Sequence, residues 1–134
     1  MTQEQKDLLL KDLCARLPYG VKVLYENEIF DVEYVCPMYE EVKLDNHETW
    51  TLNIEEVKPY LFPLSSMTDE QKEFVKNKFC YDWDIDDYPY SLWAYCIGIG
   101  DMDELIDWFH TNQFDYRGLI PMGLAIDATG LNIY

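Results

Sequence analysis

A change of hydrophobic period near the start of the chain does most to constrain its fold. Residues 2–17 place apolar side chains at helical spacing, and residues 21–36 then alternate apolar and polar side chains around a polar turn. The first pattern predicts an amphipathic helix, with Thr2 as its N-cap and Gln5 completing a capping box. Such a helix has one apolar face, so it must pack against another element of the fold.

The alternating residues 21–36 predict a two-stranded antiparallel hairpin. Asn27 is the turn residue expected to adopt a positive φ angle, because asparagine tolerates the left-handed region. Pro37 is expected to end the second strand, since proline cannot donate to a strand ladder. Two further runs, at residues 42–44 and 49–54, predict additional strands.

The rest of the chain predicts a mixture of extended segments and helices. Two prolines make residues 57–64 an extended, ordered segment rather than a helix. Thr68 caps a second helix, with Phe74, Val75, Lys78 and Phe79 on its buried side. Beyond it the sequence predicts a strand at residues 91–99 and a last short strand at residues 124–127. Between them it predicts a third helix capped by Asp101, with Leu105, Ile106 and Phe109 on its buried face.

These elements together predict an α+β fold. Three helices are expected to pack on a mainly antiparallel sheet of about four to five strands. The length of the chain and the absence of a linker predict a single domain over residues 1–134.

The chain carries a strong negative charge that is concentrated toward its C-terminal end. It contains 26 acidic and 10 basic residues, which gives a net charge of −16. Residues 81–134 contain ten acids but a single base, Arg117. This charge repels nucleic acid and anionic lipid, so neither direct nucleic-acid binding nor membrane association is expected. It suits solubility alone or a basic protein partner.

The cysteines and the N-terminus predict a reduced, cytoplasmic protein. No two of the four cysteines are closer than 16 residues, so the chain has no closely spaced cysteine pair. The N-terminus is polar and lacks the apolar core of a secretory signal. No apolar run approaches the roughly 18 residues of a membrane span.

The most acidic stretch of the chain begins like a calcium-binding loop. Asp82, Asp84 and Asp86 occupy the first, third and fifth positions of such a loop. The sixth position, which requires glycine, is Asp87, and the twelfth, which requires glutamate, is Trp93. We therefore expect a solvated, charged loop rather than a specific calcium site, and weak divalent-ion binding stays open.

The sequence contains no other motif for a metal, a cofactor or catalysis. His47 and His110 are 63 residues apart, with no cysteine within ten residues of either, so no zinc site is predicted. There is no nucleophile elbow and no phosphate-binding glycine loop. A non-enzymatic protein without a cofactor is favoured over an enzyme.

Acidic and aromatic side chains are the candidates for binding a partner. Tyr and Trp supply large contact area, and carboxylates steer the approach of a basic protein. Arg117 is added as a possible recognition residue on an acidic face. The candidate residues are Asp82, Trp83, Asp84, Asp86, Asp87, Tyr88, Tyr90, Asp101, Asp103, Asp107 and Arg117.

Three stretches of the chain, taken together, resemble a known group of sequences. They are L-L-K-D-L-C-A-R-L-P-Y-G-V (9–21), V-K-P-Y-L-F-P-L-S-S-M-T (57–68) and H-T-N-Q-F-D-Y-R-G-L-I-P-M-G-L-A (110–125). Together they resemble an uncharacterised family of short acidic proteins from gut-bacterial genomes and their phage-like elements. The resemblance implies a small intracellular accessory protein, and it carries no activity or ligand over to this chain. It also suggests that residues 57–68 and 114–124 form one structural unit.

Three functions remain as hypotheses from the sequence. The preferred one is a non-enzymatic accessory protein that acts through protein–protein binding. One alternative is a phage-type inhibitor of host defence whose carboxylates mimic the phosphates of nucleic acid. The other is a small enzyme or ligand-binding domain with a pocket that the sequence does not reveal.

Overall fold

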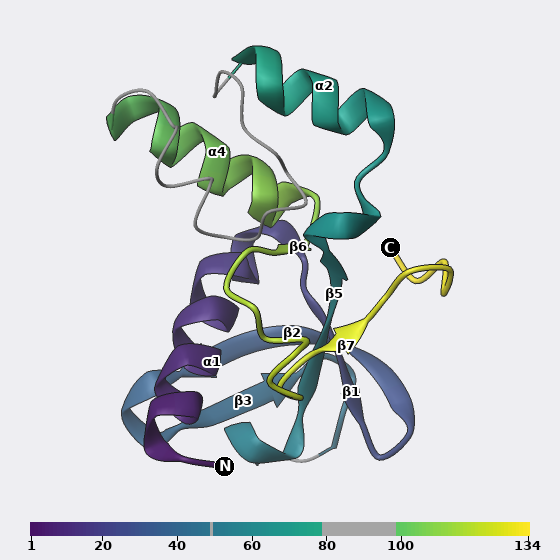
Figure 1. Ribbon diagram of the computed structural model, residues 1–134. Helices are drawn as coiled ribbons and strands as arrows, with labels where there is room; N and C mark the ends of the chain where they lie inside the picture. The colour runs from purple at the N-terminus through teal and green to yellow at the C-terminus, as the bar shows by residue number, and fades with distance from the viewer. Residues whose placement is uncertain (49, 79–98) are drawn as a thin grey trace. The chain divides into compact units, whose positions relative to one another are not determined.

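The computed structural model describes residues 1–48, 50–78 and 99–134 (Figure 1). These residues form three α-helices and seven strands. The helices are α1 (Gln3–Arg16), α2 (Asp69–Lys78) and α4 (Ile99–Thr111). The strands are β1 (Lys22–Tyr25), β2 (Glu28–Cys36), β3 (Glu41–Leu44), β4 (Leu52–Asn53), β5 (Lys58–Pro63), β6 (Phe114–Asp115) and β7 (Ile126–Asp127).

The strands form one mixed, mostly antiparallel sheet in the order β4-β3-β2-β1-β5-β6, with β7 also paired to β5. All pairs are antiparallel except those of β5 with β6 and β7. The predicted α+β class is confirmed, whereas the sheet has seven strands rather than four to five. The strands β4, β6 and β7 are each two residues long. β4 and β7 lie within runs that were predicted as strands, whereas β6 was not predicted because two residues are too few for alternation to show.

The chain divides into two compact units. Unit 1 comprises Met1–Leu61 and Leu119–Asp127, and unit 2 comprises Phe62–Gly118 and Ala128–Tyr134. The boundary falls within β5, so this strand belongs to both units in part. The single domain expected from the sequence stays a prediction.

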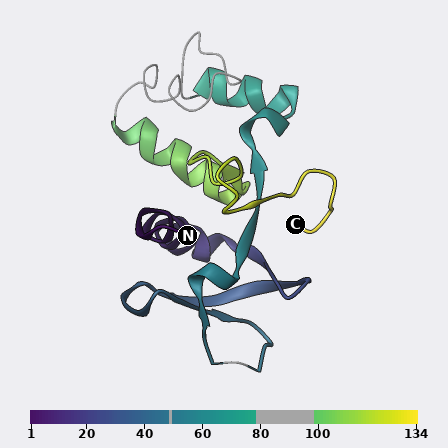
Figure 2. The same cartoon turned by 60° about the horizontal axis from the view of Figure 1, so that its bottom comes forward.

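Helix α1 in unit 1 begins and packs as its sequence predicts. The Thr2 hydroxyl accepts a hydrogen bond from the Gln5 backbone N–H at 3.2 Å, and the Gln5 side chain accepts one from the Thr2 N–H at 3.0 Å. Leu9 and Leu13 are fully buried in a core that includes side chains of β1 and β3. Figure 2 shows α1 nearly end on, on one side of the unit 1 sheet. The apolar stripe of α1 is thus buried against this sheet.

Strands β1 and β2 form the predicted hairpin. The φ angles of Glu26 and Asn27 are 47° and 64°, so both residues of the turn are left-handed. Two positive φ angles are the mark of a type I′ turn, whose twist matches that of the flanking strands. The prediction for Asn27 is confirmed, and the one for Pro37 is too, because β2 ends at Cys36. The sequence did not identify Glu26 as left-handed.

The proline-containing segment is extended, as predicted, and forms β5. Phe62 of β5 pairs in parallel with Phe114 of β6, and the Phe62 N–H donates to the Gln113 carbonyl at 2.8 Å. Residues 57–68 and 114–124, which the resemblance linked, are therefore joined directly by strand pairing.

Two of the predicted strands are shorter than expected. The run at residues 49–54 contributes only Leu52–Asn53, and the run at residues 124–127 contributes only Ile126–Asp127. Hydrogen-bonded pairing, which the apolar pattern does not encode, sets both lengths.

Helix α2 begins with the predicted capping box. The Thr68 hydroxyl accepts from the Gln71 N–H at 3.1 Å, and the Gln71 side chain accepts from the Thr68 N–H at 2.9 Å. Val75 is fully buried, as expected. Phe74 and Lys78 were wrongly placed on the buried side, because they are 43% and 53% exposed. Two adjacent helical residues point about 100° apart, so only one of them can face the centre of the core. Phe79 lies outside the described residues.

Helix α4 begins earlier than the sequence suggested. Its first residue is Ile99, so Asp101 lies within the helix rather than capping it. Leu105 and Phe109 are buried, as predicted. The remainder of the expected strand, residues 91–98, lies outside the described residues. Within the described ranges, no helix has both the length and the apolar character needed to cross a bilayer.

Candidate functional site

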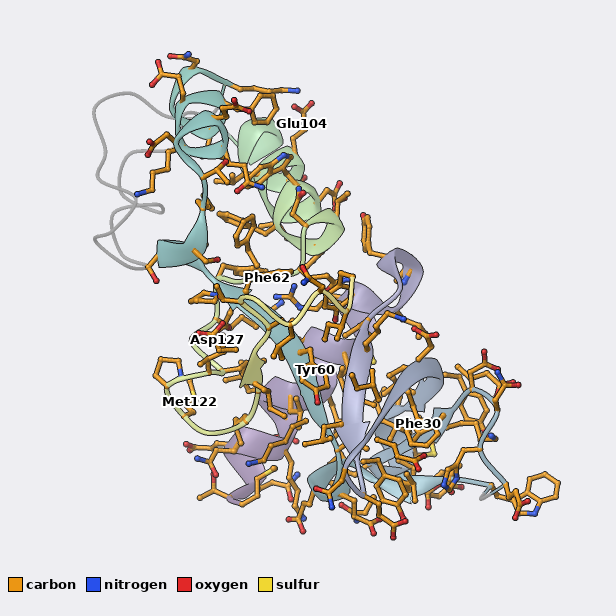
Figure 3. The ribbon with its side chains drawn as sticks, turned by 90° about the vertical axis from the view of Figure 1, so that its right-hand side faces the viewer. Phe30, Tyr60, Phe62, Glu104, Met122 and Asp127 are labelled. Carbon is orange, nitrogen blue, oxygen red and sulfur yellow. The ribbon has the colours of Figure 1, made fainter. Side chains whose placement is uncertain are left out.

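Unit 2 carries an open groove between α2 and α4, with a cavity volume of about 390 Å³. We call it the α2–α4 groove. Figure 3 labels Glu104 on α4 and Phe62 on β5, which locate unit 2 among the side chains. The groove is lined by Thr68, Glu70, Gln71 and Phe74 from the start of α2 and by Trp108 and Asn112 from the end of α4.

The floor of the groove is aromatic. The rings of Phe74 and Trp108 have centroids 5.8 Å apart and planes inclined by 30°. Trp108 in turn stacks on Phe114, with centroids 5.5 Å apart and planes inclined by 20°. Offset rings at these separations attract each other beyond the burial of their area. The floor is therefore an apolar aromatic surface, made by Phe74 and Trp108, that rests on the core of unit 2 through Phe114.

The end of α4 is fixed by its own hydrogen bonds. The Asn112 side chain donates to the Trp108 carbonyl at 2.9 Å, and the Thr111 hydroxyl donates to the Asp107 carbonyl at 2.8 Å. The Trp108 carbonyl also accepts a hydrogen bond from the Asn112 backbone N–H at 3.1 Å, so the two side chains add bonds to the last turn of the helix. Trp108 and Asn112 are thus positioned by a well-formed helix end.

His110, near the end of α4, forms a buried polar pair with Tyr116. His110 and Tyr116 are each about 5% exposed, and His110 Nε2 lies 2.7 Å from the Tyr116 hydroxyl. The Phe109 ring stacks on the Tyr116 ring with centroids 5.5 Å apart. The hydrogen bond satisfies both polar groups away from water. His110 therefore supports the fold of unit 2 and does not line the groove.

The groove is open to water at its rim and carries one carboxylate. In the described residues, the carboxylate of Glu70 has neither a hydrogen-bond nor an ion-pair partner, and its side chain is exposed. Among the described residues of the lining there is no histidine or cysteine, and the one hydroxyl, on Thr68, already serves the α2 cap. The arrangement is suited to binding a flat or cationic group rather than to nucleophilic catalysis.

A basic residue of the chain lies beside the same aromatic floor. Lys78 Nζ is 5.7 Å from the centre of the Phe74 ring and 3.9 Å from Glu104 Oε2. A cation near an aromatic face is attracted by the negative charge of that face. The floor therefore already holds a cation on the Lys78 side.

Most of the residues that the sequence suggested for partner binding are not placed. Residues 82–90, which include Asp82, Trp83, Asp84, Asp86, Asp87, Tyr88 and Tyr90, lie outside the described residues. Asp101 belongs to α4. Asp103 and Asp107 are exposed one turn apart on α4, and Asp107 directly precedes Trp108 of the groove.

Arg117 is placed by an aromatic contact within unit 2. Its guanidinium carbon lies 4.8 Å from the centre of the Tyr116 ring. The side chain is half-buried and does not line the groove. The structure therefore separates Arg117 from the groove residues.

Sequence reasoning missed Phe74 and Trp108 as site residues. Each is adjacent to a buried neighbour, Val75 or Phe109, in its helix. An apolar residue next to the central residue of a helix's apolar stripe lies at the edge of the buried face. This pattern could have identified Phe74 and Trp108 as partly exposed aromatic residues. Nothing in the sequence shows that two such edges face each other, because that depends on tertiary packing.

Unit 1 exposes aromatic and apolar side chains of its own. Trp50, Met38 and Tyr39 are 87%, 82% and 68% exposed. In the same unit, the His47 ring lies edge-on to the Phe30 ring, with centroids 5.1 Å apart (Figure 3 labels Phe30). Single exposed apolar residues are common on protein surfaces, so these residues do not define a site by themselves.

The part of the chain that is described contains no cluster of three or more histidine, cysteine, aspartate or glutamate side chains able to hold a metal ion. Cys14 and Cys36 are half-buried and form no disulfide. Burial raises the pKa of the Cys14 thiol, which lowers its thiolate fraction and hence its reactivity.

Comparison with known proteins gives no relative: no family model matches the chain, and no curated protein or solved structure matches it.

Proposed function

We propose that this chain is a non-enzymatic protein-binding module, whose α2–α4 groove takes up a basic segment of a partner protein. The observation that carries the proposal is the Glu70 carboxylate, which no described residue pairs, at the rim of the aromatic floor made by Phe74 and Trp108. Exposed aromatic rings beside a carboxylate match the composition of protein-binding hot spots.

The charge of the whole chain supports a basic partner. A net charge of −16 attracts basic proteins over long distances and repels acidic ones. Asp103 and Asp107 add exposed carboxylates on the helix that carries Trp108. Electrostatic attraction would guide the partner to the chain, and the groove would provide the short-range contact.

Capture from a host-cell lysate, with the full chain immobilised, tests this function. The parent chain is compared with Glu70→Lys, which reverses the charge at the groove. The matched control is Glu73→Lys, an identical change on the same helix at an exposed residue outside the lining. Captured proteins are quantified by mass spectrometry at low and moderate salt.

We expect a basic protein that the parent and Glu73→Lys capture equally and that Glu70→Lys captures at least about tenfold less, with salt weakening the binding. Equal capture by all three chains would overturn the groove as the binding site. Loss of capture only when Asp82, Asp84, Asp86 and Asp87 are changed to Asn would assign binding to that acidic stretch, as nucleic-acid mimicry requires.

A further inference from the structure

The α2–α4 groove has features that select among basic side chains, and we infer that its occupant is an arginine of the partner protein. In this arrangement the guanidinium group lies flat on the Phe74–Trp108 floor and pairs with the Glu70 carboxylate. The inference rests on the proposed function, because it names the partner residue of the same groove.

The aromatic rings of the floor favour a planar group. Phe74 and Trp108 line the groove with their ring centroids 5.8 Å apart, and Trp108 is held in place by stacking on Phe114. The 43% exposure of Phe74 leaves aromatic surface accessible at the groove. A guanidinium is planar and stacks on aromatic faces, whereas an ammonium group is a compact point charge that cannot stack.

The polar groups at the rim favour a group with several donors. Glu70 offers two carboxylate oxygens that no described residue uses. The Asn112 amide donates through its Nδ2 to the Trp108 carbonyl, which leaves its oxygen as an acceptor. A guanidinium has five N–H donors and no acceptor, and it binds a carboxylate with two parallel hydrogen bonds.

The chain itself shows the same chemistry elsewhere. The Arg117 guanidinium lies 4.8 Å from the centre of the Tyr116 ring, so arginine already packs on an aromatic face in unit 2. Lys78 lies beside Phe74 and would repel a second cation, but Glu104, 3.9 Å away, offsets part of its charge. Lysine hydration is strong, which makes its ammonium the poorer occupant of an aromatic site.

The test is a titration of the full chain with blocked single amino acids, followed by the indole N–H signal of Trp108 in proton–nitrogen correlation spectra. Comparison with Trp108→Phe assigns that signal among the four tryptophans. The ligands are N-acetyl amides of arginine, citrulline, lysine and leucine. Citrulline keeps the planar shape of arginine and removes its charge.

We expect the arginine amide to shift the Trp108 signal saturably and the lysine amide to bind at least about fivefold more weakly, with no saturable shift from citrulline or leucine. Glu70→Gln should weaken arginine binding about tenfold, because a charge-assisted pair is lost, and Glu73→Gln should leave it unchanged.

Other outcomes separate the inference from the proposed function. Equal binding of lysine and arginine would show recognition of charge alone and overturn the inference. Binding of leucine or citrulline as strong as that of arginine would also overturn it, while the groove would remain a docking site. A Trp108 shift that depends on protein concentration alone would identify a second copy as the occupant and overturn both proposals. Absence of any shift would overturn the inference, and the capture experiment would then decide the function separately.

Discussion

Asp12 and Arg16 are fully buried one helical turn apart on α1, with Arg16 Nε 2.8 Å from Asp12 Oδ2. Their spacing places them on the same stripe as Leu9 and Leu13, so helical periodicity alone could have predicted their burial. Sequence reasoning passed over them because charged residues are rarely buried unless they are paired. The pairing that makes the burial tolerable is a property of the folded chain.

Removal of one partner of this pair is predicted to be far more damaging than removal of both. Arg16→Met or Asp12→Leu alone should lower the free energy of unfolding by about 3–5 kcal/mol, because each leaves a buried charge without its partner. The double variant should lose much less than the sum of the two. Chemical denaturation of all four chains measures this, and additive losses would show that the two residues act independently.

The capping boxes and the hairpin show how much of each element is determined by residues close together in the sequence. Hydrogen bonds between residues three apart define both caps, so Thr2 and Thr68 were identified from sequence alone. The strands β6 and β7 are defined only by pairing with β5, which is distant in sequence. Elements set by local contacts were therefore predicted with their starting residues, whereas long-range pairing left β6 unpredicted and β7 shorter than the predicted strand.

The turn between β1 and β2 leads to a prediction about Tyr25. Burial raises the pKa of Tyr25 above its ordinary value of 10.0, and the nearby charges of Glu26 and Glu56 raise it further. Because the pKa of Tyr25 is raised in the folded state, this tyrosine contributes to stability through its neutral form. That contribution is complete below the unfolded pKa and is lost as the pH rises through the folded pKa.

The single substitution Glu26→Asn should have two effects: it should lower the pKa of Tyr25, and it should stabilise the hairpin of β1 and β2. The substitution removes the negative charge, and it places a residue that tolerates a left-handed φ where Glu26 now has a φ of 47°. The expected gain is about 0.5–1 kcal/mol. A pH titration of the Tyr25 ring signals and a denaturation curve measure the two effects, with Glu28→Asn as the control. An unchanged pKa in Glu26→Asn would contradict the assigned cause.

At the scale of the whole molecule, the net charge of −16 is the property that the sequence states most directly. It led to the choice of a basic partner, and the acidic residues that it singled out include Asp103 and Asp107, which are exposed on the helix that carries Trp108. It could not identify the groove, because Phe74 and Trp108 are 34 residues apart and meet only in the folded unit. Composition therefore predicted the kind of partner, and packing determines where that partner would bind.

Self-repulsion of this charge is predicted to limit stability at low salt. The melting temperature should rise between about 20 mM and about 500 mM NaCl as the charges are screened. Changing Asp82, Asp84, Asp86 and Asp87 to Asn removes four of the 26 acidic charges and should raise the melting temperature at low salt. Glu at the same four positions keeps the charge and is the control. A large loss of melting temperature in the Asn variant at low salt would instead show that these residues form a structural site.

The measurement that tests the central claim most directly is photo-cross-linking from the groove itself. Phe74 is replaced by p-benzoylphenylalanine in the full chain, and the same probe at Tyr39 of unit 1 is the control. After irradiation in host-cell lysate, mass spectrometry locates the cross-linked peptide. We predict a cross-link from position 74 to an arginine-containing segment of a basic protein, absent in the Glu70→Lys background and absent from the Tyr39 probe. Cross-links that are the same from both positions, or that survive Glu70→Lys unchanged, would contradict the account.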